Sequence, residues 1–301
     1  MNPVPFILLA ISLPLLLGGC GEKPVAEVEP VVETKPVEEV PLNPNLKYEI
    51  KDGTVTITDC DEGASGKLVI PSTIEGKTVI SIGANTFSRC TSLTSIIIPD
   101  SVTSIGNYGF YKCEGLMSIT IPDGVTSIGD GAFRDCASLT SIIIPDSVTS
   151  IGKDAFLYCS NLTRIKIPNS VTSIGEGAFS QCTSLTSITI PDSVTSIGER
   201  TFYACSSLTS IDIPDSVTSI GRSAFGCTSL TSITIPESVI SIGDIAFEKC
   251  TSLKSVTFLG DAPKSGYVFF NSSPVIYRKS EAKGWGETWG KQPVKLISEK
   301  P

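Results

Sequence analysis

The chain has 301 residues, of which 31 are acidic and 23 are basic, so its net charge is −8 at neutral pH. It contains no histidine, which excludes His-based catalytic triads, Cys-His pairs and His-ligated zinc. The negative charge argues against nucleic acid as a partner, because nucleic-acid binding needs clustered Lys and Arg. A composition of 26 Gly, 20 Pro and 10 Cys, with 7% aromatic residues, favours short strands and turns over helices.

The N-terminus carries an apolar stretch over residues 1–19 that ends in small residues directly before Cys20. It is too short to span a bilayer as a helix, and Pro5 and Pro14 disfavour a continuous helix. Residues 17–20, with the sequence LGGC, resemble a bacterial lipobox. The resemblance implies a lipoprotein signal peptide over residues 1–19 and a lipidated Cys20. The alternative is an ordinary secretory signal followed by a chance cysteine.

Residues 20–45 are predicted to be the lipidated Cys20 followed by a disordered tether. The segment alternates Pro, Val and Glu and has too few large apolar side chains to form a core. Its prolines favour extended conformations, which at about 3.1 Å per residue would reach roughly 75 Å from a lipid surface. A β-hairpin is predicted next, because residues 48–50 and 54–57 alternate in polarity around Asp52-Gly53.

A 23-residue repeat dominates the rest of the chain. Phenylalanine recurs every 23 residues from Phe87 to Phe225 and returns at Phe247 after a one-residue deletion. A fixed period over eight copies is the signature of a solenoid. A cysteine column keeps the same period: Cys90, Cys113, Cys136, Cys159, Cys182, Cys205, Cys227 and Cys250.

The copy over residues 93–115 shows which positions are expected to face the core. Its L-x-x-I-x-I segment predicts one short strand per coil, ended by proline. Asp100 is expected to cap the following turn by accepting hydrogen bonds from backbone N–H groups. Gly106 is expected to supply a positive φ at the next corner. The seven expected core positions of this copy are Leu93, Ile96, Ile98, Val102, Ile105, Phe110 and Cys113.

The pattern L-x-x-I-x-I-P-x-x-V-x-x-I-G-x-x-A-F-x-x-C resembles the BspA-like bacterial leucine-rich repeats, a class of surface antigens and adhesins. The resemblance covers about residues 46–301. It implies a mainly-β solenoid, a right-handed, curved, parallel stack of about 8–9 coils whose strands line one face. Residues 46–258 would hold the N-terminal hairpin cap and the leucine-rich repeats. Residues 259–301 would form a C-terminal capping segment, in which Trp285 and Trp289 act as an apolar lid or, alternatively, as a ligand-stacking site.

Two columns of residues, one of cysteines and one of acidic residues, suggest disulfides or metal sites, and both interpretations are disfavoured. Stacked cysteines have parallel Cβ vectors, which do not suit a disulfide, and a single column cannot surround a zinc ion. We therefore expect free, buried thiols. The acidic residue after each Ile-Pro could form a calcium ladder, but a role in the turn explains it equally well. We predict no metal and no cofactor. This acidic column consists of Asp100, Asp123, Asp146, Asn169, Asp192, Asp215 and Glu237.

The outward strand positions should form the inner face of the arc. They are mostly Ser and Thr, and the exceptions gather near the middle of the chain. Variable residues on a rigid scaffold are where specificity is placed, although neutral drift would give a similar pattern. The predicted binding face consists of Ile143, Arg164, Lys166, Thr189 and Asp212. A second set of variable residues flanks each Phe and is expected on the outer side: Tyr108, Tyr111, Arg134, Tyr158, Arg200 and Tyr203.

These features predict an adhesin-like lipoprotein of the bacterial cell envelope, at the outer membrane or cell surface. It would bind a protein or a glycan without catalysis and would contact the membrane through the lipid on Cys20. The alternative is a structural envelope spacer with no specific ligand. An enzyme is not expected, since a glycosidase needs two convergent carboxylates and the inner face offers only Asp212. The oligomeric state is left open.

Overall fold

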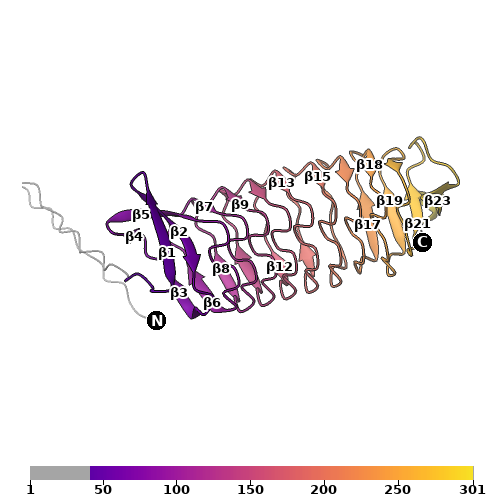
Figure 1. The fold of residues 1–301 in the computed structure, drawn as a ribbon. Coiled ribbons are helices and arrows are strands. Elements are labelled where there is room, and N and C mark those ends of the chain that lie inside the picture. The colour runs from indigo at the N-terminus through magenta and orange to yellow at the C-terminus, as the bar shows by residue number, and fades with distance from the viewer. Residues whose placement is uncertain (1–40, 301) are drawn as a thin grey trace, which may run out of the picture. The chain divides into compact units, whose positions relative to one another are not determined.

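The computed structural model describes residues 41–300. The predicted signal peptide, the predicted lipidation site Cys20 and most of the predicted tether lie outside the described residues. The described chain is a stack of short β-coils that runs from β1 to β23, as Figure 1 shows. It makes about ten turns, slightly more than the 8–9 expected, and the predicted solenoid is confirmed. No helix in residues 41–300 is long and apolar enough to cross a membrane.

The stack begins with the expected β-hairpin. Strands β1 (Leu46–Lys51) and β2 (Thr54–Cys60) pair antiparallel. Asp52 and Gly53 at the turn have φ angles of 51° and 78°, the left-handed region that a tight hairpin turn needs. A second hairpin joins β4 (Thr73–Ile74) to β5 (Lys77–Ile82), and β5 also pairs parallel with β2. The first hairpin therefore hydrogen-bonds directly to the repeats.

Most coils contribute to two parallel ladders, whereas the sequence predicted only one strand; the coil of residues 208–214 has no strand in the first ladder. In the coil of residues 93–115, the second strand is the Thr-Ser-Ile segment after the Pro-Asp-Ser turn, which also pairs with its neighbours. Figure 1 shows the two ladders on different sides of the stack. The first ladder contains β3 (Ser65–Val69), β6 (Ser92–Ile97), β8 (Ser118–Thr120), β10 (Ser141–Ile143), β12 (Arg164–Ile165), β14 (Ser187–Ile188), β17 (Ser232–Ile235), β19 (Ser255–Phe258), β21 (Val275–Arg278) and β23 (Gln292–Leu296). The second contains β5, β7 (Ser104–Ile105), β9 (Ser127–Ile128), β11 (Ser150–Ile151), β13 (Ser173–Ile174), β15 (Ser196–Ile197), β16 (Ser219–Ile220), β18 (Ser241–Ile242) and β20 (Lys264–Ser265).

The third side of each coil consists of turns around the repeated phenylalanine. The described residues contain one short 3-10 helix, Ile297–Glu299, and no α-helix. All seven core positions expected in residues 93–115 are buried. Nine Phe rings stack in one file from Phe87 to Phe269, with centroids 5.2–5.8 Å apart and planes within 20° of parallel. This spacing exceeds the usual strand spacing of about 4.8 Å, as a curved stack with its strands on the inner side requires.

The role expected for Gly106 is wrong. Its φ is not positive; the positive φ falls two residues later, at Tyr108, and again at Lys112. A Cβ on Gly106 would instead lie 2.5 Å from the backbone nitrogen of Ala84 in the preceding coil. The glycine is therefore needed because two coils approach closely here.

The capping role expected for Asp100 is also wrong. Within residues 41–300 its carboxylate accepts no hydrogen bond, and the turn is closed by the Val102 N–H, which donates to the Pro99 carbonyl at 3.0 Å. The adjacent Ser101 hydroxyl donates to the carbonyl of Val79 in the preceding coil at 2.7 Å. The serine therefore ties the turn to its neighbour, and the carboxylate is left facing solvent.

The cysteine column links successive coils. The nine cysteines among the described residues are free, and all but Cys227 are buried. The Cys113 thiol donates to the carbonyl of Phe87 at 3.0 Å, and this contact to the preceding coil recurs along the column. Burial raises the pKa of Cys205 to about 12 and also raises the pKa of Cys159 well above its ordinary value.

Cys227 does not belong to this column, contrary to the sequence assignment. The one-residue deletion is absorbed after Phe225, so Thr228 fills the buried site and donates its hydroxyl to the Phe225 carbonyl at 2.8 Å. Cys227 takes the preceding position, with a φ of 59° and a half-buried side chain. A hydrogen bond with Cys227 raises the pKa of the Tyr203 hydroxyl, which places this thiol on the outer surface of the turns.

The C-terminal residues continue the first ladder. Strands β19, β21 and β23 pair parallel, and β22 (Thr288–Trp289) pairs antiparallel with β23. Both tryptophan rings lie 4.9 Å from the ring of Phe258. Trp285 and Trp289 donate their indole N–H groups to the carbonyls of Gly260 and Pro263. The indoles are therefore packed and hydrogen-bonded within the protein, as a lid would be.

Two glycines of the same column predict opposite responses to an added methyl group. A Cβ on Gly221 would lie 2.5 Å from the backbone carbon of Gly198, whereas a Cβ on Gly198 meets no atom closer than 3.4 Å. We expect Gly221→Ala to lower the free energy of unfolding by about 1–3 kcal/mol, because the coils must separate. Gly198→Ala should change it by less than about 0.5 kcal/mol. Urea denaturation measures both, and equal losses would contradict the close approach.

The cysteine environments predict selective alkylation. Because the thiolate is the reactive form, buried thiols with raised pKa values should resist iodoacetamide at pH 8. We expect Cys227 to be alkylated in the folded protein, while Cys159 and Cys205 react only after denaturation. Mass spectrometry of peptides assigns each adduct, and Cys227→Ser serves as the control that removes one adduct only. Protection of Cys227 in the folded protein would refute the assignment of Thr228 to the buried column.

Candidate recognition surfaces

The outward positions of the first ladder form one continuous surface, which we call the ladder face. Register pairs align Ser118 with Ser141 and Thr120 with Ile143, so equivalent positions form straight columns. The same offset places Ile143, Lys166, Thr189 and Asp212 in one column on four successive coils. Arg164 lies in the neighbouring column, paired in register with Ser187. The five predicted binding-face residues thus lie at outward positions of successive repeats, with Lys166 and Thr189 directly after β12 and β14 and Asp212 in a coil that forms no strand at this place.

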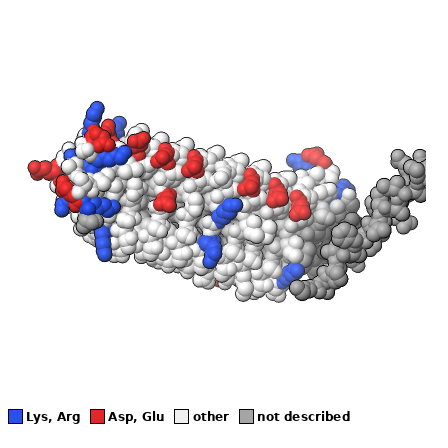
Figure 2. All heavy atoms as spheres, turned by 180° about the vertical axis from the view of Figure 1, so that it is seen from behind, with Lys and Arg blue, Asp and Glu red and all other residues white. Residues whose placement is uncertain are grey.

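The charges on the ladder face have no partner of opposite sign. Arg164, Lys166 and Asp212 are exposed, and within the described part of the chain none of them forms an ion pair. Two coil steps separate Lys166 from Asp212, a distance of about 10 Å at the usual strand spacing. Figure 2 shows one face of the stack that is mostly uncharged, with a few basic side chains in its middle and a row of acidic ones near one edge. These charges are therefore available to a partner.

An apolar patch on the ladder face was missed by the sequence interpretation. Ile97, Met117 and Ile143 are 45%, 57% and 63% exposed, large fractions for apolar side chains. A hollow of about 400 Å³ lies beside Ile97 and Thr120, with Lys67 at its margin. The sequence signals were Ile97 and Ile143, which stand where other copies have Thr and of which only Ile143 was assigned to the binding face, and Met117, which replaces the Thr found at its position in most copies. The patch extends the candidate surface toward the N-terminal end of the stack.

The turns around the phenylalanine file form a second surface, which we call the turn face. The ring of Tyr111 stacks edge-on against Tyr108 at 5.9 Å, and Lys112 and Arg134 lie 5.5 and 6.0 Å from its centroid. Such aromatic-cation groupings are common where proteins bind ligands. A hollow of about 320 Å³ lies further along this face, beside Tyr158. The variable residues expected on the outer side thus surround the phenylalanine file.

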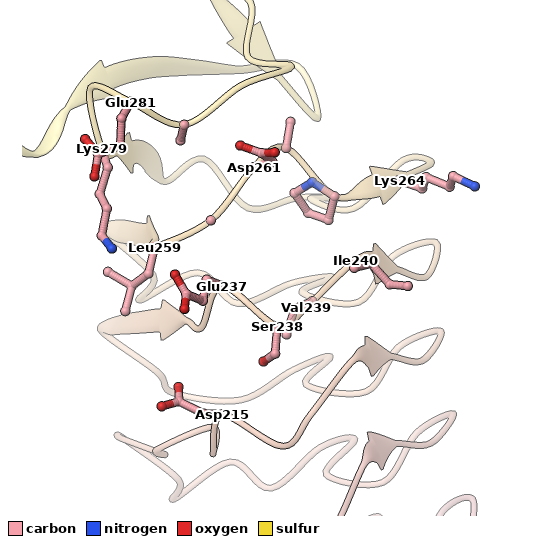
Figure 3. Close-up of a pocket in the computed structure, with 14 residues that line it drawn as sticks. Asp215, Glu237, Ser238, Val239, Ile240, Leu259, Asp261, Lys264, Lys279 and Glu281 are labelled. Carbon is pink, nitrogen blue, oxygen red and sulfur yellow. The ribbon is translucent and has the colours of Figure 1, made fainter.

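A hollow of about 790 Å³ lies where the regular coils meet the C-terminal segment. Figure 3 shows the carboxylates of Asp215, Glu237 and Glu281 on one side of it, whereas Lys264 points away. A Cβ on Gly260 would come within 2.7 Å of the Glu237 Cα, so the two backbones meet closely at its wall. Sequence reasoning missed this groove because it assigned Glu237 only to the turn column. Lys279 lies on the same side as these carboxylates, so the groove carries charges of both signs.

The structure offers no ready metal centre among the described residues. No group of three or more Cys, Asp or Glu side chains is placed to hold a metal ion. The acidic column lies exposed along one edge of the turns. The pKa of the Glu281 carboxyl is lowered by hydrogen bonds from its own backbone N–H and from the Ser280 hydroxyl. These partners are local, so Glu281 does not form a cluster with the other carboxylates of the groove.

The sequence was compared with known families and structures. The profile of the BspA type Leucine rich repeat region (6 copies) matches residues 68–183 and 149–276, which together cover more than half of the chain. No curated protein matches the sequence.

Several solved structures are similar. A leucine-rich repeat protein from Bacteroides ovatus is 28% identical, with a TM-score of 0.64, and the match covers 85% of this chain and 76% of that one. The leucine rich repeat protein of T. pallidum is 32% identical, with a TM-score of 0.56, over 62% of this chain and 86% of that one. A leucine rich cell surface protein from Faecalibacterium prausnitzii is 27% identical, with a TM-score of 0.39, over 80% and 94%. With its repeat, its two ladders and the matching profile in agreement, the chain belongs to the BspA type leucine-rich repeat family.

Proposed function

We propose that this protein is an adhesin-like binding scaffold of the bacterial cell envelope, which recognises a protein or a glycan on its ladder face. The observation that carries this proposal is the set of unpaired charges at Arg164, Lys166 and Asp212, whose neighbours on the same face are mostly uncharged. A charge held on a rigid backbone without a partner favours a complementary ligand, and it repels others. The stacked coils supply that rigidity.

The shape of the ladder face favours a macromolecule. Its outward residues extend over many successive coils, and the hollow beside Ile97 is lined by neighbouring coils and opens onto this surface. A protein or glycan chain can make many weak contacts across such a surface. The exposed Ile97, Met117 and Ile143 would add apolar contacts at one end of the same surface.

The proposed location depends on the N-terminal residues. The resemblance of residues 17–20 to a lipobox supports lipidation of Cys20. The Pro- and Glu-rich segment that follows would then hold the ladder face away from the membrane. This arrangement suits a protein that meets its partner at the outer membrane or cell surface.

The proposed activity is binding without catalysis. The regular outward positions of the ladder face offer one carboxylate, Asp212, and hydrolysis of a glycoside needs two at about 5–10 Å. Any turnover that Asp212→Asn abolishes would overturn this part of the proposal.

A structural spacer is the second candidate function, and the regularity of the coils favours it. The same serine-to-carbonyl contact recurs at Ser101, Ser147, Ser170 and Ser216, each reaching the preceding coil. A spacer needs only these repeated contacts and no distinctive surface residues. The two candidate functions therefore differ in whether the identity of the outward residues matters.

Charge reversal tests the ladder face. We expect Arg164→Glu/Lys166→Glu to weaken binding of the whole chain to a partner recovered from envelope or host extracts at least tenfold, about 1.4 kcal/mol. The matched control, Lys153→Glu/Arg222→Glu, changes the net charge equally at exposed sites outside the predicted binding face. Surface plasmon resonance at two salt concentrations measures both variants. Unchanged binding by the first variant would remove these residues from the proposed site.

Deletion of coils separates the binder from the spacer. Removing residues 139–184, two whole repeats, takes away Ile143, Arg164 and Lys166, whereas removing residues 93–138 shortens the stack equally and keeps them. A binder should lose attachment of the bacterium only with the first deletion, and both shortened chains should remain folded because coils stack independently of their number. Attachment that survives both deletions would favour the spacer.

A further inference from the structure

The turn face concentrates the tyrosines of this chain. Five of the seven tyrosines lie at outward positions around the phenylalanine file, whereas the regular coils of the ladder face carry none. Tyrosine is typical of recognition surfaces, because its ring offers a large contact area and its hydroxyl a hydrogen bond. These five residues are Tyr108, Tyr111, Tyr158, Tyr203 and Tyr267.

The backbone conformation makes some of these side chains costly. Tyr158, Gln181 and Arg200 have positive φ angles of 63°, 61° and 53°. Side chains with a Cβ are disfavoured in this region. Arg200 lies two residues before its Phe, a position that Gly131 and Gly177 hold in other coils, whereas Tyr158 and Gln181 lie two residues after theirs, a position that holds no glycine in the coils from Phe87 to Phe269. The buried phenylalanine file does not require a large side chain at these places.

A hollow of about 320 Å³ brings these three residues together. Its lining comes from successive coils and includes Tyr158, Gln181 and Arg200, with Arg134 and Tyr203. The volume is at the lower end of the range for small-molecule sites, about 300–1,000 Å³.

A glycine shapes the floor of this hollow. A Cβ on Gly177 would lie 2.2 Å from the Oδ1 atom of Asp154, so a larger residue there would push that carboxylate aside. Asp154 in turn lies 3.8 Å from the Nη1 atom of Arg134. The Asp154 carboxylate, which is the hydrogen-bond acceptor in the hollow, is therefore held in place by Arg134 of the preceding coil.

The chemistry of the lining favours a neutral, hydroxyl-rich ligand. Arg134 and Arg200 are balanced by Asp154 and Glu248, so neither an anion nor a cation is preferred. The carboxylate of Asp154, the amide of Gln181 and the guanidinium of Arg200 are planar groups that can each bind two adjacent hydroxyls. Together they offer both hydrogen-bond donors and hydrogen-bond acceptors. Tyr158, which is 45% exposed, presents a ring against which the C–H face of a sugar can pack.

We propose that this hollow on the turn face binds a neutral sugar unit of one or two rings. The ring of Tyr158 packs against the sugar, while Gln181, Arg200 and Asp154 bind its hydroxyls. This site goes beyond the proposed function of the ladder face, because it uses a different side of the coil and different residues. The protein then carries two separate recognition surfaces.

Saturation-transfer NMR tests the sugar site with the whole chain and three neutral probes: cellobiose, maltose and N,N′-diacetylchitobiose at millimolar concentration. We expect transfer to the ring protons of at least one probe, and a loss of affinity of at least tenfold in Tyr158→Ala. Tyr108→Ala is the matched control, since Tyr108 also has a positive φ, 57°, on the turn face but does not line the hollow. Gln181→Ala gives a second, independent loss if Tyr158→Ala does not fold.

Several outcomes would overturn the proposal. They are no transfer to any of the three sugars, transfer that survives both Tyr158→Ala and Gln181→Ala, or an equal loss in Tyr108→Ala. A hollow that instead accepts a protein side chain would show no sugar transfer. Arg164→Glu/Lys166→Glu should leave sugar binding unchanged, so failure of the ladder-face proposal and failure of the sugar site are distinguishable.

Discussion

Contact between neighbouring coils is the interaction on which the rest of the structure depends. The Phe110 N–H donates to the following coil at Ala132, while the Gly106 N–H donates to the preceding coil at Ile82. Each ring of the phenylalanine file packs between two others, and each buried thiol reaches the coil before it. A coil alone would leave these groups unpaired and its rings half exposed. Stability therefore comes from stacking, and it is shared along the whole array.

This constraint also fixes the surfaces. Because every coil must repeat the path of its neighbours, equivalent outward residues align in a column. A residue that differs in type from the others in its column is therefore displayed at a distance from them that the coil spacing sets. Arg164 and Lys166 stand out for this reason, since the columns around them are mostly uncharged. The coils contribute a rigid frame, and a small number of substitutions provide whatever specificity the frame carries.

The periodic part of the fold could be predicted from the sequence, because the side chains that recur every 23 residues are the ones that the stacked coils bury. The phenylalanine file, the inward isoleucines and the hairpin at Asp52-Gly53 are all as expected. Features that depend on distances between coils could not be predicted. The role of Gly106 is to avoid a clash with a residue 22 positions earlier, and the deletion is absorbed where Thr228, not Cys227, takes the buried site and donates to the Phe225 carbonyl. The C-terminal groove depends on a segment that has no repeat.

The two faces differ because the backbone treats their side chains differently. On the ladder face, neighbouring strands place side chains side by side at the strand spacing, so small and β-branched residues such as Ser, Thr and Ile fit best. In the turns, positive φ angles direct side chains outward with fewer lateral neighbours, and long residues such as Tyr158 and Arg200 can be accommodated. Substitutions on the first face change charge and polarity on a flat surface. Substitutions on the second build hollows, so one repeat can supply both kinds of site.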